Sequence, residues 1–229
     1  MIAISFALPE ESKDLVRRLS EARRWGGAVV TGRLGKKQVI VVHSGMGMAS
    51  ATERVGAFLE KNAPSIWIAA GFGGGLSPDL AVGEIVVVEN FSAPSLMEAV
   101  GGLPARRGTL ITTRQVVETA EQKKDLARHT GAIVVDMETA AIQRLCGPRG
   151  ILMLSIRAIS DTAGQDLPVP AEVWFNMKTQ RPRPGRLVSY LAAHPGRIAP
   201  FARFVRGINV ARASLTSFLL AALAALPEK

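Results

Sequence analysis

The sequence predicts an α/β protein in which helices cover a mixed central sheet. Apolar runs of strand length alternate with amphipathic stretches of helix length between residues 2 and 159, which is typical of layered α/β architecture. Residues 28–33 and 38–44 flank the turn Gly35-Lys36-Lys37 and indicate a hairpin. Because a hairpin pairs its strands antiparallel, we expect a mixed sheet rather than a purely parallel one.

The individual elements follow from periodicity and from glycine and proline positions. We expect strands at residues 2–8, 28–33, 38–44, 65–70, 84–89, 109–112, 133–135 and 151–159. We expect helices at residues 10–22, 45–62 and 119–130, and a further helix that ends at Arg144. Residues 162–185 contain four prolines and predict a loop or lid. Residues 186–226 predict one or two amphipathic helices, interrupted at Pro195 and Pro200.

Length and composition limit the organisation of the chain. Its 229 residues, 48% of them hydrophobic, predict a single domain over 1–229, with a basic, Pro- and Arg-rich lid and a helical C-terminal segment at about 164–229. The lone Cys146 cannot form an intrachain disulfide, which favours the cytoplasm. Residues 1–9 are typical of a first strand rather than a signal peptide. The longest apolar run, 215–226, is shorter than the roughly 20 residues that span a bilayer.

The net charge of +9 is concentrated near the C-terminus. Residues 1–172 are almost balanced, whereas residues 173–227 contain eight basic and no acidic side chains. Interleaved Arg, Phe and Leu across 174–212 favour contact with an anionic membrane surface, and hence a peripheral position on the inner membrane. The alternatives are a solvated helix face or an acidic protein partner. We expect no nucleic acid partner, because few aromatic residues there could stack on bases.

Asp161 is the first candidate for chemistry. The apolar stretch Leu154–Ala163 ends on this carboxylate, and ligands of α/β proteins bind beyond the carboxyl ends of strands. A positioned carboxylic acid whose pKa is raised by its pocket can protonate a leaving group near neutral pH. The alternative is a helix N-cap, for which Asp is a preferred residue.

Two glutamates follow other predicted strands. Glu138, in Val-Asp-Met-Glu-Thr-Ala, could accept hydrogen bonds from two vicinal hydroxyls, or could serve only as an acidic residue in the first helical turn. Glu11 follows the first strand, next to Glu10, and both could be solvated acids at a helix start. The glycines Gly45, Gly71 and Gly73 predict turns whose backbone N–H groups approach a phosphate or hydroxyl.

Three segments together resemble one enzyme family. The stretches 157–163 (Arg-Ala-Ile-Ser-Asp-Thr-Ala), 135–140 and 71–87 are similar, in order and spacing, to the nucleoside phosphorylases and the methylthioadenosine/S-adenosylhomocysteine nucleosidases, which cleave N-glycosidic bonds. The resemblance implies a three-layer α/β/α fold of the phosphorylase/hydrolase type with a mixed central sheet. It also implies a homo-oligomer that uses no metal or organic cofactor, with phosphate as a co-substrate only in the phosphorylases.

The resemblance also assigns roles to residues. Asp161 would protonate the leaving purine, and Glu138 would hold the ribose hydroxyls, with Met137 packed against the sugar. Glu11 would activate water or contact the sugar 5′ side. Arg157 would support Asp161 or be structural.

The chain departs from the family pattern at three positions. Ala69 stands where phosphorylases place a phosphate-binding arginine, which favours hydrolysis. Phe72 replaces a usual serine and is expected to narrow the nucleophile pocket, and the base-contacting aromatic expected near Val116 and Val117 is missing. Phosphorolysis and non-catalytic nucleoside binding therefore stay open as alternatives.

The expected substrate is a purine nucleoside, adenine-bearing and modified at its 5′ carbon. The segment from Trp174 to Arg212 is similar to the hopanoid-associated branch of the family, whose substrate, adenosylhopane, joins a triterpenoid to the 5′ carbon of adenosine. The three histidines, His43, His129 and His194, show no spacing typical of a metal site.

Overall fold

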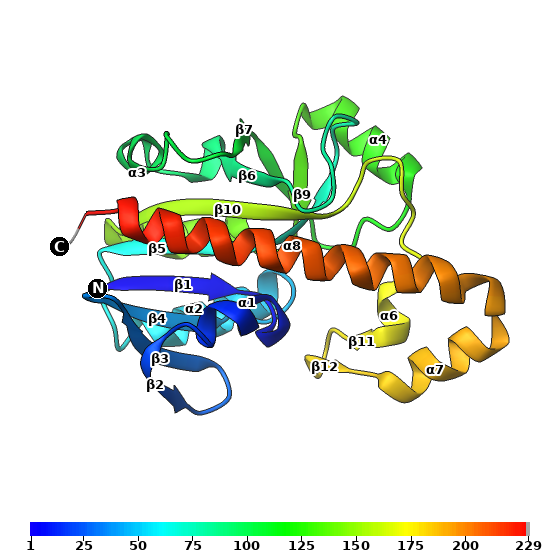
Figure 1. Cartoon of the computed structure of the whole chain (residues 1–229), viewed down its shortest axis with the longest axis horizontal. Helices are drawn as coiled ribbons and strands as arrows, with labels where there is room; N and C mark the ends of the chain where they lie inside the picture. Colours follow the sequence, from blue (N-terminus) through cyan, green and yellow to red (C-terminus); the bar gives the residue numbers. More distant parts are fainter. Residues whose placement is uncertain (228–229) are drawn as a thin grey trace.

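The computed structural model describes residues 1–227, and its centre is a ten-stranded sheet (Figure 1). Eight strands form one path in the order β2-β3-β4-β1-β5-β10-β6-β7, and β9 pairs with both β5 and β8. Their bounds are β1 Ile2–Phe6, β2 Ser20–Trp25, β3 Val29–Leu34, β4 Lys37–His43, β5 Ile66–Gly75, β6 Ile85–Val88, β7 Arg106–Gly108, β8 Leu110–Thr112, β9 Val134–Asp136 and β10 Leu152–Asp161.

The sheet is mixed, as predicted. Strand β1 pairs parallel with β4 and β5, and β5 pairs parallel with β10. The β3–β4 hairpin and the β10–β6 pair are antiparallel. The three central strands β1, β5 and β10 therefore point the same way, and their carboxyl ends meet at one edge.

Helices cover both faces of this sheet, which confirms the predicted three-layer α/β/α fold. One face packs against α1, α3 and α8, and the other against α2 and α5. Alternation along β1 shows the division, because Ile4 and Phe6 join the first apolar cluster and Ala3 joins the second. The helix bounds are α1 Pro9–Val16, α2 Met48–Leu59, α3 Pro94–Ala99, α4 Ala120–Thr130, α5 Thr139–Cys146, α6 Ala171–Trp174, α7 Pro184–Ala193 and α8 Ile198–Ala225.

The helix predicted for residues 10–22 is shorter than expected. Helix α1 ends at Val16, and the charged residues 20–25 form the edge strand β2. All six of its residues are exposed, and its partner is β3. A strand with no buried face carries no apolar alternation, so its hydrogen bonds to β3 decide its conformation.

The glycines of β5 lie within a strand, whereas a turn after residue 70 was predicted. Strand β5 continues to Gly75, and Gly71 to Gly74 pair with β10 or β9. A Cβ atom on Gly73 would lie 2.6 Å from Cγ1 of Val134, and one on Gly71 would lie 3.0 Å from Oε1 of Glu11. These glycines therefore permit close approach of neighbouring elements rather than a turn.

The predicted lid contains regular structure. It holds α6 and a small hairpin of β11 (Phe175–Asn176) and β12 (Arg181–Pro182). Pro195 separates α7 from α8, as predicted, but Pro200 does not interrupt α8. Pro200 lies in the first turn of α8, where a missing backbone N–H costs no hydrogen bond.

Helix α8 crosses one face of the sheet (Figure 1). By length and composition alone, Pro195–Ala225 is apolar enough to span a membrane, although the sequence suggested only a shorter run. Its C-terminal half packs in the core through Leu215, Leu219 and Leu223, which is typical of a core helix. Its N-terminal half extends past the sheet toward α6 and α7.

We expect Gly73→Ala to destabilise the protein by about 1–3 kcal/mol, because the new methyl group would collide with the buried side chain of Val134. Urea unfolding measures the change. Gly164→Ala is the matched control, since a Cβ there meets no atom within 4 Å. Equal stabilities of the two variants would contradict the close packing of β5 against β9.

Candidate active site

Glu138 is the N-cap residue of α5, but its side chain does not cap the helix. Asp136 performs that task, because its Oδ2 accepts a hydrogen bond of 3.0 Å from the backbone N of Thr139. The Oε1 of Glu138 instead accepts a bond of 2.6 Å from the backbone N of Gly47. The side chain of Glu138 therefore contacts the loop before α2, rather than serving only as an acidic residue at the start of α5.

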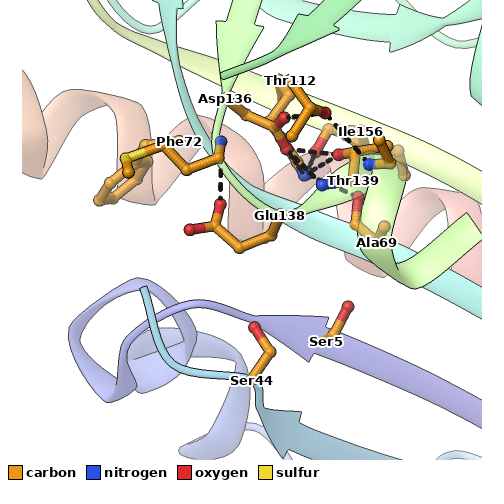
Figure 2. A network of polar contacts seen from close by, with 12 residues as sticks. Ser5, Ser44, Ala69, Phe72, Thr112, Asp136, Glu138, Thr139 and Ile156 are labelled. Carbon is orange, nitrogen blue, oxygen red and sulfur yellow. Dashed lines mark hydrogen bonds and ion pairs between the residues drawn. The ribbon is translucent and has the colours of Figure 1, made fainter. Parts of the chain in front are cut away.

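A buried ion pair fixes the strand ends beside Glu138. Nη2 of Arg157 lies 2.6 Å from Oδ2 of Asp136, and Nη1 donates to the carbonyl oxygens of Ala69 and Ile156 at 2.7 and 2.9 Å. Figure 2 shows Asp136, Thr112 and Thr139 within this network. The ion-pair partner of Arg157 is Asp136 rather than Asp161.

Glu11 faces the same region from the start of α1. Its two carboxylate oxygens accept hydrogen bonds of 2.9 Å, Oε2 from the backbone N of Leu8 and Oε1 from the backbone N of Phe72. Its neighbour Glu10 is exposed, so Glu11 is the buried one of the two acids.

A small cavity lies between these groups. Glu11, Glu138 and Arg157 line it, together with Gly71 and residues at the ends of β1, β4 and β5. It offers about 10 Å³ to the centre of a water molecule, which suffices for one water. Ser5 and Ser44 also line it, on the side opposite Asp136 and Thr139 in Figure 2.

The two glutamates have weakened acidity. Burial raises the pKa of Glu138 to about 8, and the nearby Asp136 carboxylate adds to this effect. Burial likewise raises the pKa of Glu11, against the opposing effect of its hydrogen bonds from Leu8 and Phe72. A carboxylate with a raised pKa is a stronger base, which suits Glu11 to proton abstraction from water.

Asp161 is the last residue of β10 and pairs with Gly74 of β5. It does not cap a helix, because the residues that follow form a turn. Its Oδ1 accepts a hydrogen bond of 2.6 Å from Ser160, and its Oδ2 lies 2.5 Å from Nζ of Lys123. Four residues along β10 separate Asp161 from Arg157, or about 13 Å at the usual strand rise.

The other predicted residues have varied positions. Gly45 adopts φ +77°, and its N donates to the carbonyl oxygen of Ala7 at 3.0 Å. Half-buried Met137 has its Cε 3.9 Å from the position of a Cβ on Gly47. Val116 is half-buried in the loop before α4, and no hydrogen bond or apolar cluster of the described residues connects it to Asp161.

Phe72 is one of the residues that line the cavity. Its side chain packs against the apolar cluster beneath α1 and α8. The part of Phe72 that faces Glu11 is its backbone N–H.

Sequence reasoning missed three contributors. Lys123 contacts Asp161, and Gly47 binds Glu138. Gln180 of the lid bonds both backbone groups of Met46, with its Oε1 2.7 Å from the N and its Nε2 3.0 Å from the O. Among residues 1–227, no cluster of three or more His, Cys, Asp or Glu side chains could hold a metal ion.

Comparison with known families gives the class of protein. The family model of the Phosphorylase superfamily matches residues 1–94 and 94–193. The chain belongs to this superfamily, which confirms the resemblance inferred from the three sequence segments.

Two curated relatives have the same name. The 5′-methylthioadenosine/S-adenosylhomocysteine nucleosidase of Shewanella halifaxensis is 27% identical over 204 residues, which is 73% of this chain and 89% of the relative. The enzyme of the same name from Anoxybacillus flavithermus is 28% identical over 207 residues, covering 75% and 89%.

Solved structures confirm the fold. The Streptococcus pneumoniae MTA/SAH nucleosidase in complex with 8-aminoadenine superposes with a TM-score of 0.75 at 21% identity, covering 98% of this chain and 99% of that one. The futalosine hydrolase of Helicobacter pylori gives 0.71 at 19%, covering 98% and 97%.

The raised pKa of Glu138 predicts a specific dependence of stability on pH. The unfolded chain releases this proton near pH 4.5 and the folded protein near 8, so the unfolded state binds fewer protons in between and stability falls as pH rises. We expect Glu138→Gln to remove this fall. The free energy of unfolding of the variant should then exceed that of wild type by ~3 kcal/mol at about pH 7.

Thermal unfolding from about pH 5 to 8 measures this difference. Glu10→Gln, at an exposed carboxylate, is the control and should follow wild type. Parallel curves for wild type and Glu138→Gln would contradict the buried, neutral state of Glu138.

Proposed function

We propose that the protein hydrolyses the N-glycosidic bond of an adenine nucleoside that is modified at its 5′ carbon. The observation that carries this proposal is the cavity for one water between Glu11, Glu138 and Arg157, at the same sheet edge as Asp161. Membership of the Phosphorylase superfamily and the shared name of the curated relatives support it.

Each group has a defined task in this reaction. Glu138 accepts hydrogen bonds from the ribose hydroxyls, while Met137 packs against the sugar. Glu11 takes a proton from the water that attacks the anomeric carbon. As the bond to the base breaks, its electrons move into the purine, and Asp161 protonates N7 of the leaving base.

Water suits this site better than phosphate. The cavity has room for about one water, and two carboxylates line it. Ala69 is buried, and its carbonyl oxygen is occupied by Arg157. Four of the five N–H donors of Arg157 have protein acceptors and its buried Nε has none, so little of its charge is free for an anion.

The lid supports an apolar 5′ substituent. Cε of Met177 would lie 3.1 Å from a Cβ on Gly47, so the β11–β12 hairpin lies next to the loop that binds Glu138. We propose that the substituent extends under this hairpin, and that its particular identity is the triterpenoid of adenosylhopane. The predicted homo-oligomer stays part of the proposal.

The surface beyond the sheet supports attachment to a cytoplasmic, anionic membrane. Val188, Ile198 and Val205 are exposed on α7 and α8. The exposed basic residues around them are Arg186, Arg197, Arg203 and Arg206. Arg212, which the sequence grouped with them, is paired instead with Asp14 at 2.8 Å.

We expect Asp161→Asn to lower kcat for adenine release by about 100- to 10,000-fold, because an amide cannot protonate the purine. Release of adenine from adenosine and from 5′-alkylated adenosines, followed by chromatography, measures the change. A circular dichroism spectrum that matches that of wild type shows that the fold is retained. Full activity in this variant would remove Asp161 from the mechanism.

We expect the protein to bind vesicles of phosphatidylglycerol but not of phosphatidylcholine, and less tightly as salt rises. Changing Arg186, Arg197, Arg203 and Arg206 to Gln should weaken binding by about 1 kcal/mol per residue. The control variant changes Arg23 and Arg24, which are exposed on β2. Equal loss in both variants, or no binding by wild type, would contradict the membrane surface.

A further inference from the structure

Lys123 is a fully buried cation that the reaction above leaves unused. Its side chain is 0% exposed, in a helix whose other charged residues face solvent. All three of its N–H donors have acceptors, since Nζ lies 2.5 Å from Oδ2 of Asp161 and donates to the carbonyl oxygens of Thr162 and Gln165 at 2.9 and 2.7 Å. It therefore offers no free donor to a substrate.

The position of this ammonium is fixed from several sides. Thr119 caps α4 by accepting a hydrogen bond of 3.1 Å from the backbone N of Gln122. The N of Ala120 donates to Asp166 at 2.8 Å, which joins the start of α4 to the loop after β10. Lys123 holds the same loop through its two carbonyl contacts. These contacts fix the position of the Lys123 ammonium group beside Asp161.

We propose that Lys123 is a positioning residue for leaving-group protonation, which holds the carboxyl group of Asp161 and stabilises the charge that develops there. Asp161 first takes up a proton from solvent and then passes it to N7 as the glycosidic electrons enter the purine, which leaves Asp161 as a carboxylate paired with Lys123. The ammonium of Lys123 is already aimed at that oxygen, so no reorganisation is needed. This inference rests on the proposed function.

The geometry favours this role over a purely structural one. Of the ion pairs among residues 1–227, only this one and Asp136–Arg157 are deeply buried. The pair at Asp136 organises a helix start, whereas Lys123 contacts the proposed proton donor directly. Ser160 donates to the other oxygen of Asp161, so the orientation of the carboxyl group is fixed from both sides.

The test is a double-mutant cycle measured as the steady-state rate of adenine release over a range of substrate concentrations. We expect Lys123→Met to lower the rate about 100-fold with the Michaelis constant nearly unchanged, because Lys123 does not touch the substrate. Lys124→Met, at the exposed neighbour, is the matched control and should equal wild type. In the Asp161→Asn background, Lys123→Met should add no further loss, since its effect passes through Asp161.

The cycle remains decisive if Lys123→Met alone fails to fold, because the double variant leaves no unpaired buried charge and is compared with Asp161→Asn. Losses that multiply, or a Lys123→Met rate equal to that of Lys124→Met, would overturn the inference while leaving the proposed function intact. A wild-type protein that releases no adenine would overturn both.

Discussion

The buried contact between Asp136 and Arg157 is the interaction on which the rest of the site depends. Asp136 ends β9 and binds the start of α5, while Arg157 reaches from β10 to the backbone of β5. One ion pair therefore joins three strands and a helix. By fixing the start of α5, it also fixes the position of the Glu138 backbone. Removing one partner of such a pair costs about 3–5 kcal/mol, because the other charge is left buried and unpaired. The position of Glu138 is thereby coupled to the stability of the fold.

The glycine-rich end of β5 is the second constraint. Without side chains at Gly71 and Gly73, Glu11 and β9 approach the strand closely. The same absence leaves space for about one water beside the strand ends. Backbone N–H groups then replace side chains as ligands, as the Phe72 contact to Glu11 illustrates. Because backbone N–H groups donate to them, the carboxyl groups of two glutamates can be buried there with hydrogen-bond partners.

The layered fold and the three carboxylates were predictable because buried strands leave apolar runs and because each acid follows such a run. Strand β2 was not predictable from the sequence, because its exposed, charged residues show no apolar periodicity. Its conformation depends on pairing with β3. The strand predicted from the sequence was shorter than β5, because glycine residues are as typical of turns as of places where neighbouring elements approach closely. Lys123 was hidden in a run of charges, although it precedes Leu126 and Ala127 by three and four positions, which places it on the buried face of α4. The Asp136–Arg157 pair joins residues far apart in sequence, so no local pattern could predict it.

Hydrolysis by one bound water is the central claim, and the fate of labelled oxygen tests it most directly. Wild-type protein is incubated with adenosine and with 5′-alkylated adenosines in ¹⁸O-labelled water, with and without phosphate, and the sugar product is analysed by mass spectrometry. The account predicts free adenine and a sugar that carries one ¹⁸O at its anomeric carbon. Adenine release that requires phosphate and yields a sugar 1-phosphate would contradict it, as would binding of every nucleoside without release of its base.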